Sequence, residues 1–580
     1  MERILRINMT DRTATFEPVP DRYAHRAGRW LTSSIVHDEV PPTSHPLSPD
    51  NVVVFSPGVV TGTAAPTSSR ISVGAKSPLT GTIKEANAGT GWGGRLARLG
   101  IRAIVVEGMA SGDDWWLVKV SQDEGRFEPA DEWSGIKLSE AYASIYERYG
   151  GVEAIDVCAI GVAGEQRMAA AGVCFSDREG RASRYAGRGG IGAVLGSKRL
   201  KAIIVDDSGA EGVSIADQAL FDEGRKKVAD ALMSHDITKP KGALNTYGTA
   251  VLVNIINEAG ALPTRNFREG RFDGAEKIAG EAIFDGNKER TGSELYNHPC
   301  SPGCIIACSN VWHREDGSEH TSCIEYESDW ALGANCGIDD LDAIAEMNQL
   351  CNEYGLDTIE MGGTIAVAME GGVAAFGDAQ RAIELLHEVG EATPRGRILG
   401  NGAVVTGRAY GVERVPHVKG QNMPAYEPRA IKGIGMTYAT TPMGADHTAG
   451  YTIAPEILGV SEKLDPLDPD KASVAKGFQE ATAFIDSTGH CLFIAFAILD
   501  IESGFEGMID ECNGVLGTNW DADDVTRIGG EILALERAFN RKAGFTNVHD
   551  RLPAFMESEP LPPHDAVWDI SDAELDKVSE

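Results

Sequence analysis

Hydrophobic residues in the first third of the chain come in short runs, most of them bounded by glycine-rich turns. Some runs are continuous and others alternate with polar residues, which is the pattern of β-strands buried on both faces or on one. The N-terminal segment alternates in the same way before it reaches a turn. The runs predict strands within 52–59, 70–75, 102–108, 115–120, 154–161 and 200–207. A strand-rich region therefore extends to about residue 208.

After this region the apolar positions follow helical spacing. The clearest helix spans residues 341–354, and its apolar residues fall on one face. This face consists of Leu341, Ile344, Met347, Cys351 and Tyr354. Asp339 or Asp340 can cap the N-terminus of the helix, and Gly355 can end it in a left-handed turn.

A second helix is predicted for roughly residues 471–485. Each of these two helices leads into a polar residue, two spacers, a glycine, one further residue and then a functional side chain, in segments 352–357 and 486–491. The match hints at two equivalent loops that face one ligand with two similar halves, and simple helix capping is the alternative. Asp357 also predicts the N-cap of a following helix, with Glu360 placed as in a capping box.

The change of pattern near residue 208 and a segment near residue 415 divide the chain into three predicted domains. A chain of 580 residues exceeds the size of one typical hydrophobic core. The predicted class is α+β. A β-rich N-terminal domain over 1–208 is followed by a helical domain with the cysteine loop over 209–415 and a C-terminal helical domain over 416–580.

The composition disfavours several classes of function. The formal net charge is −33, and no basic stripe of the kind that binds nucleic acid is present. The same acidity disfavours an anionic membrane surface as a partner. The N-terminus has no apolar signal core and no apolar run reaches membrane-spanning length, so a cytoplasmic protein without a membrane span is expected.

Ten cysteines in a chain without a secretion signal favour metal or redox chemistry over disulfides. Cys300, Cys304 and Cys308 lie on one short loop, and Cys491 follows far downstream. A triplet with a single cysteine suits a four-iron cluster, in which each iron takes one cysteine sulfur. A structural zinc site, which usually shows two close pairs, and unligated thiols are the alternatives. The other cysteines are predicted to be small core residues: Cys158, Cys174, Cys323, Cys336, Cys351 and Cys512.

Two segments of the strand-rich region combine glycine with arginine. One begins at Arg70 and continues into the glycines after Asn87, and the other runs from Arg184 to Gly192. Glycines let backbone N–H groups curl around a phosphate, and arginine binds it through two parallel hydrogen bonds. Neither segment fits a Walker A loop, and tight turns in a β-rich domain are the alternative.

Several long motifs, in one order along the chain, resemble the aldehyde:ferredoxin oxidoreductase family of tungsten enzymes. They are SRISVGAKSPLTG, RYAGRGGIGAVLGSKRLKAI, IEYESDWALGANCGIDDLDAI, EYGLDT, EPRAIKGIGMTYAT, GADH and DSTGHC. The similarity extends from Ile4 to about Asn547. In that family a β-rich base carries a tungsten cofactor with two pterins, and two largely helical domains cover it. The resemblance therefore implies a tungsten–bis-pterin cofactor, a [4Fe-4S] cluster and Mg²⁺.

The resemblance also implies roles for individual residues. Those that match pterin- and phosphate-binding positions are Arg70, Asn87, Gly89, Arg184, Ala186, Gly187, Arg188, Asn352, Leu356, Asp357, Asp486 and His490. Asn87 and the Ala186 region match positions near a magnesium ion that bridges the phosphates. The cluster ligands would be Cys300, Cys304, Cys308 and Cys491. Glu327 matches an acid/base residue near the metal, and His447 matches its partner.

By this resemblance the protein is expected to oxidise a small aldehyde to a carboxylic acid and to pass electrons to ferredoxin or an iron–sulfur partner subunit, as a homodimer or hetero-oligomer. Glu327 is expected to take a proton from the attacking water or hydroxide, and His447 to donate a hydrogen bond to the carbonyl oxygen. A same-family reductase of an aromatic acyl-CoA or another activated acid is an alternative that an additional cysteine near the metal would favour. A non-catalytic iron–sulfur subunit and a zinc-stabilised binding protein are the alternatives from other classes.

The sequence departs from the family pattern at four places. Three residues rather than two separate Cys300 from Cys304, so the loop must bulge by one residue. Asn352 stands where aspartate is common, and Met443 stands where many members have arginine, which puts one pterin contact in doubt. His490 replaces a usual apolar residue. Its imidazole is expected either to hydrogen-bond a pterin or cluster sulfur or to face solvent.

Some members of the family hold an iron ion between two subunits through glutamate and histidine. Glu346 and His387 are approximate candidates, and a plain helical pair of Glu384 with His387 is the alternative. Tungsten and molybdenum are not distinguished by the sequence, because dithiolene ligands suit either metal.

Overall fold

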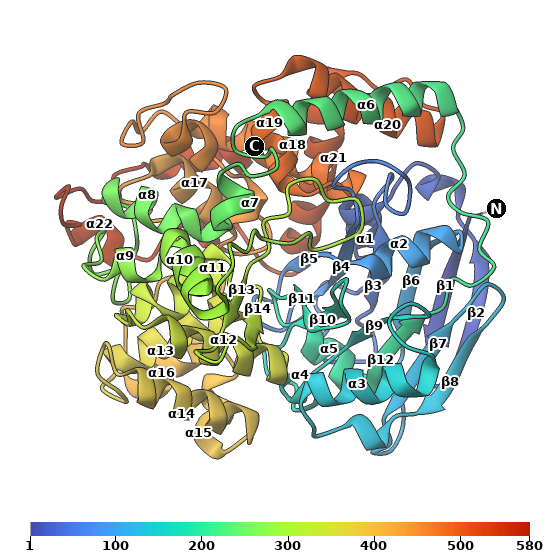
Figure 1. The fold of residues 1–580 in the computed structure, drawn as a ribbon, viewed down its shortest axis with the longest axis horizontal. Coiled ribbons are helices and arrows are strands. Elements are labelled where there is room, and N and C mark those ends of the chain that lie inside the picture. Colours follow the sequence, from blue (N-terminus) through green and yellow to red (C-terminus); the bar gives the residue numbers. More distant parts are fainter. Residues whose placement is uncertain (1, 580) are drawn as a thin grey trace.

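The computed structural model describes residues 2–579, and its N-terminal third contains two six-stranded sheets (Figure 1). Every run predicted as a strand contains one. The first sheet consists of β1 (Arg3–Asn8), β2 (Thr13–Pro18), β3 (Val53–Pro57), β4 (Arg70–Lys76), β5 (Ile83–Gly89) and β6 (Ile101–Glu107). The second consists of β7 (Trp116–Val120), β8 (Gly125–Pro129), β9 (Asp156–Ala159), β10 (Val173–Ser176), β11 (Ala182–Ala186) and β12 (Leu200–Val205).

The two sheets repeat one topology. Their strand orders are β2-β1-β6-β3-β4-β5 and β8-β7-β12-β9-β10-β11, and each contains one parallel pair, β1 with β6 and β7 with β12. Helices occupy equivalent places in the two units. They are α1 (Gly28–Glu39) before β3, α3 (Leu138–Tyr149) before β9, α2 (Gly91–Arg98) before β6 and α5 (Ile191–Ser197) before β12, with α4 (Val162–Glu165) added in the second unit.

One hydrophobic core joins the two sheets. Phe55 from β3, Trp92 from α2 and Phe175 from β10 contact one another, with ring centroids 5.5 to 6.4 Å apart. Such tilted and edge-to-face contacts stabilise a core beyond the burial of apolar area alone. The repeated units therefore form one base with a shared core.

The rest of the chain is mainly helical, which confirms the α+β class (Figure 1). Its helices before residue 415 are α6 (Gln218–Ser234), α7 (Ala243–Tyr247), α8 (Leu252–Glu258), α9 (Ala275–Ile278), α10 (Gly280–Thr291), α11 (Tyr326–Leu332), α12 (Leu341–Tyr354), α13 (Thr358–Glu370), α14 (Ala379–Gly390), α15 (Pro394–Leu399) and α16 (Ala403–Tyr410). Those after it are α17 (Lys432–Thr440), α18 (Ala472–Thr488), α19 (Ala495–Ile498), α20 (Glu502–Leu516), α21 (Ala522–Lys542), α22 (Phe555–Ser558) and α23 (Asp572–Ser579). Two hairpins, β13 (Val311–His313) with β14 (Glu319–Ser322) and β15 (His417–Val418) with β16 (Gln421–Asn422), complete it.

The helical part shares one large hydrophobic cluster across residue 415. Trp330 and Met361 belong to the same cluster as Tyr438 and Ile532. In addition α6 packs along α20 near the top of Figure 1, although the two come from different predicted domains. The division at residue 415 thus stays a prediction, because separate cores do not mark it.

Local capping follows the prediction in most respects. Asp340 accepts hydrogen bonds from two backbone N–H groups at the start of α12, and Gly355 ends that helix with a φ of 76°. Asp357 caps α13. The predicted capping box is wrong, because the buried carboxylate of Glu360 accepts hydrogen bonds from two backbone N–H groups of distant segments instead.

Within residues 2–579 no single helix combines the length and apolar character that crossing a membrane requires. One bent pair, Ala472–Thr488 with Leu492–Ile498 at 119°, meets those two criteria only when taken together.

Candidate active site

The four predicted cluster cysteines line one cavity of about 260 Å³, although they come from distant parts of the chain. Cys300, Cys304 and Cys308 lie on the loop between α10 and β13, and Cys491 follows α18. Cys491 is buried and its backbone N–H donates a 2.9 Å hydrogen bond to the carbonyl oxygen of Thr67, on the first sheet's side. The base and the C-terminal helices therefore bring the single cysteine to the triplet.

Two arginines of the base face these sulfur atoms. Nη2 of Arg70 lies 3.2 Å from Sγ of Cys491, and Arg184 lines the same cavity. A hydrogen bond with Cys304 and the guanidinium groups of Arg184 and Arg70 hold the pKa of Cys300 well below its usual range, whereas that hydrogen bond raises the pKa of Cys304 and burial raises the pKa of Cys308. Because the thiolate is the metal-binding form of cysteine, Cys300 is ready to ligate a metal, and ligation by Cys304 and Cys308 would release their protons.

The loop between the first two cysteines forms an exposed turn. Gly303 has a φ of 76°, and its carbonyl oxygen accepts a 2.9 Å hydrogen bond from the backbone N–H of Thr67. On the opposite side Gly89 ends β5, where an added Cβ would lie 2.9 Å from Sγ of Cys300. A larger residue at position 89 would therefore enter the space beside the sulfur atom.

A second cavity of about 260 Å³ adjoins the first and collects most of the predicted pterin-binding residues. The two cavities share the lining residues Arg70, Tyr185, Cys323, Ile359 and His447. Of the predicted cofactor residues, the second cavity is lined by Arg70, Asn87, Gly187, Arg188, Asn352, Leu356, Asp357 and Asp486, and the first by Arg70, Gly89 and Arg184. The structure thus brings together residues from both sheets and from both helical segments.

The loops after α12 and α18 contact the two repeated sheets in equivalent ways. Gly355 lies against Gly161, which follows β9, and Gly489 lies against Gly58, which follows β3. A Cβ on Gly161 would lie 2.4 Å from the carbonyl oxygen of Tyr354, and one on Gly58 would lie 2.1 Å from the backbone nitrogen of Gly489. Because β3 and β9 hold the same place in the repeat, this geometry supports the interpretation of two equivalent loops around one site.

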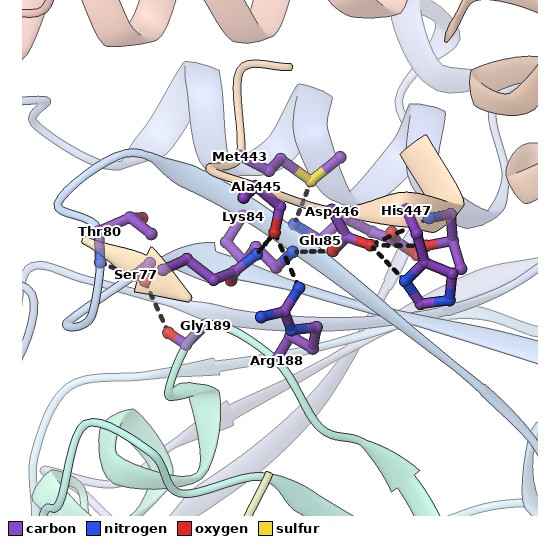
Figure 2. Close-up of polar contacts among 12 residues, drawn as sticks. Ser77, Thr80, Lys84, Glu85, Arg188, Gly189, Met443, Ala445, Asp446 and His447 are labelled. Carbon is purple, nitrogen blue, oxygen red and sulfur yellow. Dashed lines mark hydrogen bonds and ion pairs between the residues drawn. The ribbon is translucent and has the colours of Figure 1, made fainter. Parts of the chain in front are cut away.

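The segment that carries His447 is fixed to the base by an ion pair (Figure 2). Nζ of Lys84 lies 2.8 Å from Oδ2 of Asp446, and the two side chains are only 1% and 9% exposed. Arg188 donates a 2.8 Å hydrogen bond to the carbonyl oxygen of Ala445. Although burial opposes the shift, Lys84 and Arg188 hold the pKa of Asp446 well below its usual range. Asp446 is therefore ionised and anchors the segment.

Met443 lies on the wall of the second cavity, at a position where many members of the family that the sequence resembles carry arginine. The backbone N–H of Glu85 points at its Sδ over 3.1 Å (Figure 2). Glu85 lines the same cavity, and burial together with the nearby Asp486 raises its pKa. Methionine has no hydrogen-bond donor, so this wall cannot make the contact of an arginine.

Glu327 and His447 face each other in the cysteine-lined cavity, and His447 also lines the second cavity. Oε1 of Glu327 lies 3.5 Å from Nε2 of His447, while Oε2 accepts a 3.0 Å hydrogen bond from the backbone N–H of Ala425. Glu327 Oε1 and His447 Nδ1 are buried without a hydrogen-bond partner among the described residues. Burial raises the pKa of Glu327 to about 8 and lowers the pKa of His447 to about 4. The pair offers a carboxyl that titrates near neutral pH beside a neutral imidazole.

Two predicted cofactor residues, Ala186 and His490, line neither cavity. Ala186 is the buried last residue of β11. The expectation that His490 faces solvent is wrong, because His490 is only 1% exposed. Its Nε2 lies 2.8 Å from Oε2 of Glu511 on α20, and its Nδ1 lies 2.9 Å from Oγ1 of Thr488. The imidazole therefore binds a helix outside the cavities.

The prediction for Cys323 is also wrong. The other five cysteines outside the predicted cluster are buried, but Cys323 lines both cavities, and its Sγ lies 3.3 Å from Nη1 of Arg184. No spacing to the cysteine triplet signalled this position. Asp446 and Lys84 were missed as well. Asp446 was open to detection because it lies in the GADH motif beside His447, whereas Lys84 carries no local signal.

The two candidates for an iron between subunits have separate partners. Glu346 lies 2.9 Å from Nε2 of His320, and Nδ1 of His387 lies 3.2 Å from the hydroxyl of Tyr354. In the part of the chain that the structure describes, neither belongs to a group of three side chains close enough to hold one metal ion. Glu384 forms its ion pair with Arg381. The inter-subunit iron stays a prediction.

Comparison with known proteins gives matches along nearly the whole chain. The profile of the aldehyde ferredoxin oxidoreductase N-terminal domain matches residues 4–207, and the profile of domains 2 and 3 of the same enzymes matches residues 223–578. The tungsten-containing aldehyde ferredoxin oxidoreductases of Pyrococcus abyssi and Pyrococcus furiosus are 38% and 39% identical to this chain, over 97% of its length and 92% of theirs.

More distant matches extend the comparison. The WOR-like subunit of an aliphatic sulfonate oxidoreductase from Pyrococcus furiosus is 25% identical over 85% of this chain and 77% of its own length. Among solved structures, the active-site complex BamBC of benzoyl coenzyme A reductase with 1,5-dienoyl-CoA superposes with a TM-score of 0.79, at 19% identity, over 99% of this chain and 92% of that one. This last similarity shows a shared fold. From the profiles and the close relatives it follows that the chain belongs to the aldehyde ferredoxin oxidoreductase family of oxidoreductases.

Proposed function

We propose that this protein oxidises aldehydes to carboxylic acids with a tungsten–bis-pterin cofactor and delivers the electrons through a [4Fe-4S] cluster to ferredoxin or an iron–sulfur partner subunit. The observation that carries the proposal is the Glu327–His447 pair beside the four cysteines. Each turnover converts one aldehyde and one water into one carboxylic acid, two protons and two electrons. The site therefore needs a proton acceptor, a partner for the carbonyl oxygen and an outlet for electrons.

The lining residues fit the proposed cofactor. When bound, it accepts the substrate's two electrons and releases them singly, and its pterins supply the metal ligands. Arg70 and Arg188 offer guanidinium groups, and Asn352 and Asp486 offer polar groups, on the walls of the second cavity. We assign Asn87 and the backbone near Ala186 to the magnesium ion, because Mg²⁺ prefers oxygen ligands.

The spacing of the sulfur atoms favours a cluster over a zinc ion. A Zn–S distance of about 2.3 Å in a tetrahedron places the sulfur atoms about 3.8 Å apart. Within residues 2–579, one group of three metal-ligating side chains has its ligand atoms within 4.8 Å of one another, and it consists of Asp177, Glu179 and His298. No three of the described cysteines meet this criterion. Four cysteines around one cavity suit four irons, each with one cysteine.

Glu327 and His447 have complementary tasks in this proposal. The ionised carboxylate of Glu327 takes a proton from the water that attacks the carbonyl carbon. Nδ1 of His447 lies 3.8 Å from Oδ1 of Asp446 and makes no hydrogen bond in the described chain, so its N–H is assigned to the carbonyl oxygen, on which negative charge develops. Because burial keeps the imidazole neutral, it donates a hydrogen bond without releasing a proton to solvent. The Lys84–Asp446 ion pair holds His447 in place from the next residue.

One observation favours a second candidate, a reductase of an aromatic acyl-CoA or another activated acid. Cys323 places an additional thiol on the wall that both cavities share. Burial raises the pKa of this thiol to about 12, and it also raises the pKa of Cys308, so protonation of the thiols does not separate the two candidates. The Glu327–His447 pair, in contrast, is already arranged for addition of water to a carbonyl group. The same pair also argues against a non-catalytic iron–sulfur subunit.

Substrate assays on the anaerobically purified enzyme separate the two candidates. Acetaldehyde and benzaldehyde are offered with oxidised benzyl viologen, and benzoyl-CoA is offered with a low-potential electron donor. The proposal predicts aldehyde-dependent dye reduction, with two electrons for each carboxylate formed. Reduction of benzoyl-CoA without oxidation of either aldehyde would establish the second candidate instead.

A further inference from the structure

A third cavity, of about 390 Å³, lies behind the segment that carries His447. Thr440 and Pro442 of that segment line it, whereas Met443 and Asp446 line the predicted cofactor cavity on the other side. The charged groups on its wall are the cations Lys419, Arg537 and Arg541 and the carboxylate Asp550. A cavity with an excess of positive charge is unexpected in a chain whose net charge is −33.

Lys419 is the fixed part of this wall. Its side chain is 2% exposed, and its Nζ donates hydrogen bonds of 3.0 and 3.1 Å to the carbonyl oxygens of Ala439 and Thr441. The same Nζ lies 2.5 Å from Oδ1 of Asp550. The only carboxylate among the described residues of the wall is thus already paired with Lys419.

The two arginines lie one turn apart on α21 and carry the remaining charge. Nε of Arg537 is buried without a hydrogen-bond partner among the described residues, and its Nη2 reaches only Oε1 of Gln479, at 3.4 Å. Burial lowers the pKa of Arg537 even though Asp550, Glu536 and Glu480 lie nearby. Glu536 is held by Arg29 at 2.8 Å, as Asp550 is held by Lys419, and Glu480 forms no ion pair with Arg537 among the described residues. A half-buried guanidinium whose buried N–H group is left open is stabilised when a further anion reaches it.

We propose that this cavity binds a small molecule through an oxyanion, a phosphate or carboxylate group, held by Arg537 and Arg541. A guanidinium group presents two parallel N–H donors that match the spacing of such oxygens. One water molecule occupies about 30 Å³ in the liquid, so the cavity has room for the organic part of the ligand beside its anionic group. Phe545 on the same wall provides an apolar surface for that part.

The bound anion would act on residues 440–447, the segment that carries His447, from the side opposite the predicted cofactor cavity. Nδ2 of Asn540, on α21 beside Arg541, donates a 2.7 Å hydrogen bond to the carbonyl oxygen of Pro442. Lys419 holds the carbonyl oxygen of Thr441 from the opposite element. Toward the cofactor cavity the same segment is held by Lys84 and Arg188 (Figure 2). Ligand bound between the arginines therefore restrains residues 440–447.

Titration calorimetry of the full-length, anaerobically purified enzyme tests the binding site, with inorganic phosphate and sodium acetate as separate probes. Saturable binding of one or both is expected, and it weakens at least tenfold in Arg537→Gln and in Arg541→Gln. Arg541 is exposed, so its replacement leaves the fold intact. Arg527→Gln is the matched control, because Arg527 is exposed on the same helix and pairs with Asp524 and Glu531 away from the cavity.

The outcomes distinguish the ligand class. Binding of phosphate alone identifies a phosphate-bearing ligand, and binding of acetate alone identifies a carboxylate. Absence of saturable binding by both probes, or wild-type affinity in both cavity variants, overturns the proposal. Hydrogen exchange with the tighter probe then tests the restraint, and exchange in residues 440–447 is expected to slow. Neither measurement requires aldehyde oxidation, so a failure here is independent of the proposed catalytic function.

Discussion

The Glu327→Gln substitution keeps the shape of a buried side chain and removes its ability to accept a proton. Glutamine retains an oxygen for the hydrogen bond that the backbone N–H of Ala425 donates at 3.0 Å. A neutral amide is also easier to bury than a carboxylate, so we expect α11 and the cysteine loop to keep their structure. The variant therefore changes proton transfer without changing the architecture of the site.

The size of the effect follows from the environment of Glu327. Burial raises its pKa from 4.5 to about 8. Since the ionised form is the base, about a tenth of the wild-type enzyme is active at pH 7 and about a hundredth at pH 6. The wild-type kcat/KM should thus rise about tenfold per pH unit and level off above about pH 8. Loss of a general base lowers the rate about 10²- to 10⁴-fold, or by about 2.7 to 5.5 kcal/mol in transition-state stabilisation.

The assay is aldehyde-dependent reduction of benzyl viologen between pH 6 and 9, with tungsten and iron measured in every preparation. We expect Glu327→Gln to keep the wild-type metal content, to lose the rate and to lose the rise with pH. Glu456→Gln is a matched control, because burial raises the pKa of Glu456 to about 7 but this residue lines neither cavity. A Glu327→Gln enzyme with the wild-type rate and pH profile would refute the role of Glu327 as base.

Three further substitutions test the surroundings of the site. Arg70→Gln removes the donor that lies 3.2 Å from Cys491 Sγ. A hydrogen bond to a charged group contributes about 1.5–3 kcal/mol, and its stronger effect on the more negative reduced cluster sets the potential. The midpoint potential should therefore fall, by at most about 60–130 mV, in a titration followed by electron paramagnetic resonance, and a raised or unchanged potential contradicts this. Lys84→Met leaves Asp446 buried without its partner and should lower the free energy of unfolding by about 3–5 kcal/mol, measured by thermal melting. Because Lys84 and Arg188 depress the pKa of Asp446, the difference in free energy of unfolding between the wild type and Lys84→Met should be complete above the unfolded-state pKa near 4 and should shrink as the pH falls below it. Equal melting temperatures of the two proteins at pH 7 would argue against the ion pair. His490→Leu strands the carboxyl of Glu511 and should lower the melting temperature, while the double variant with Glu511→Leu should recover most of the loss; a double variant less stable than the single one contradicts this pairing.

The sequence predicted strands from continuous and from alternating apolar runs, whereas β2, β5, β8, β10 and β11 lie outside the predicted runs. Continuous runs mark strands that are buried on both faces. β3 and β6 are such strands, and nearly all of their residues are buried. The helices between the strands were not predicted. α2 and α5 are short and rich in glycine, so they lack an apolar periodicity that a window can detect. The sequence nevertheless indicates the repeat. An Ala-Gly pair occurs at 88–89 and again at 186–187, and each pair is followed by a glycine-rich helix and a strand.

Site residues were predictable where a local motif carried them. The cysteine triplet and the loops after α12 and α18 are local, and all four cysteines line one cavity. Cys323 and Lys84 were not predictable, because their positions depend on contacts between segments far apart in the chain. The failed capping box of Glu360 has the same cause, since buried backbone N–H groups from distant segments compete with the local partner.

The proposed cofactors fix the metal content of the protein. Elemental analysis of the anaerobically purified protein, together with the electron paramagnetic resonance spectrum of the reduced form, tests it most directly. We expect about four iron atoms and one tungsten atom per chain, with the signal of a reduced four-iron cluster that is lost in Cys491→Ser. Zinc in place of iron and tungsten would contradict it.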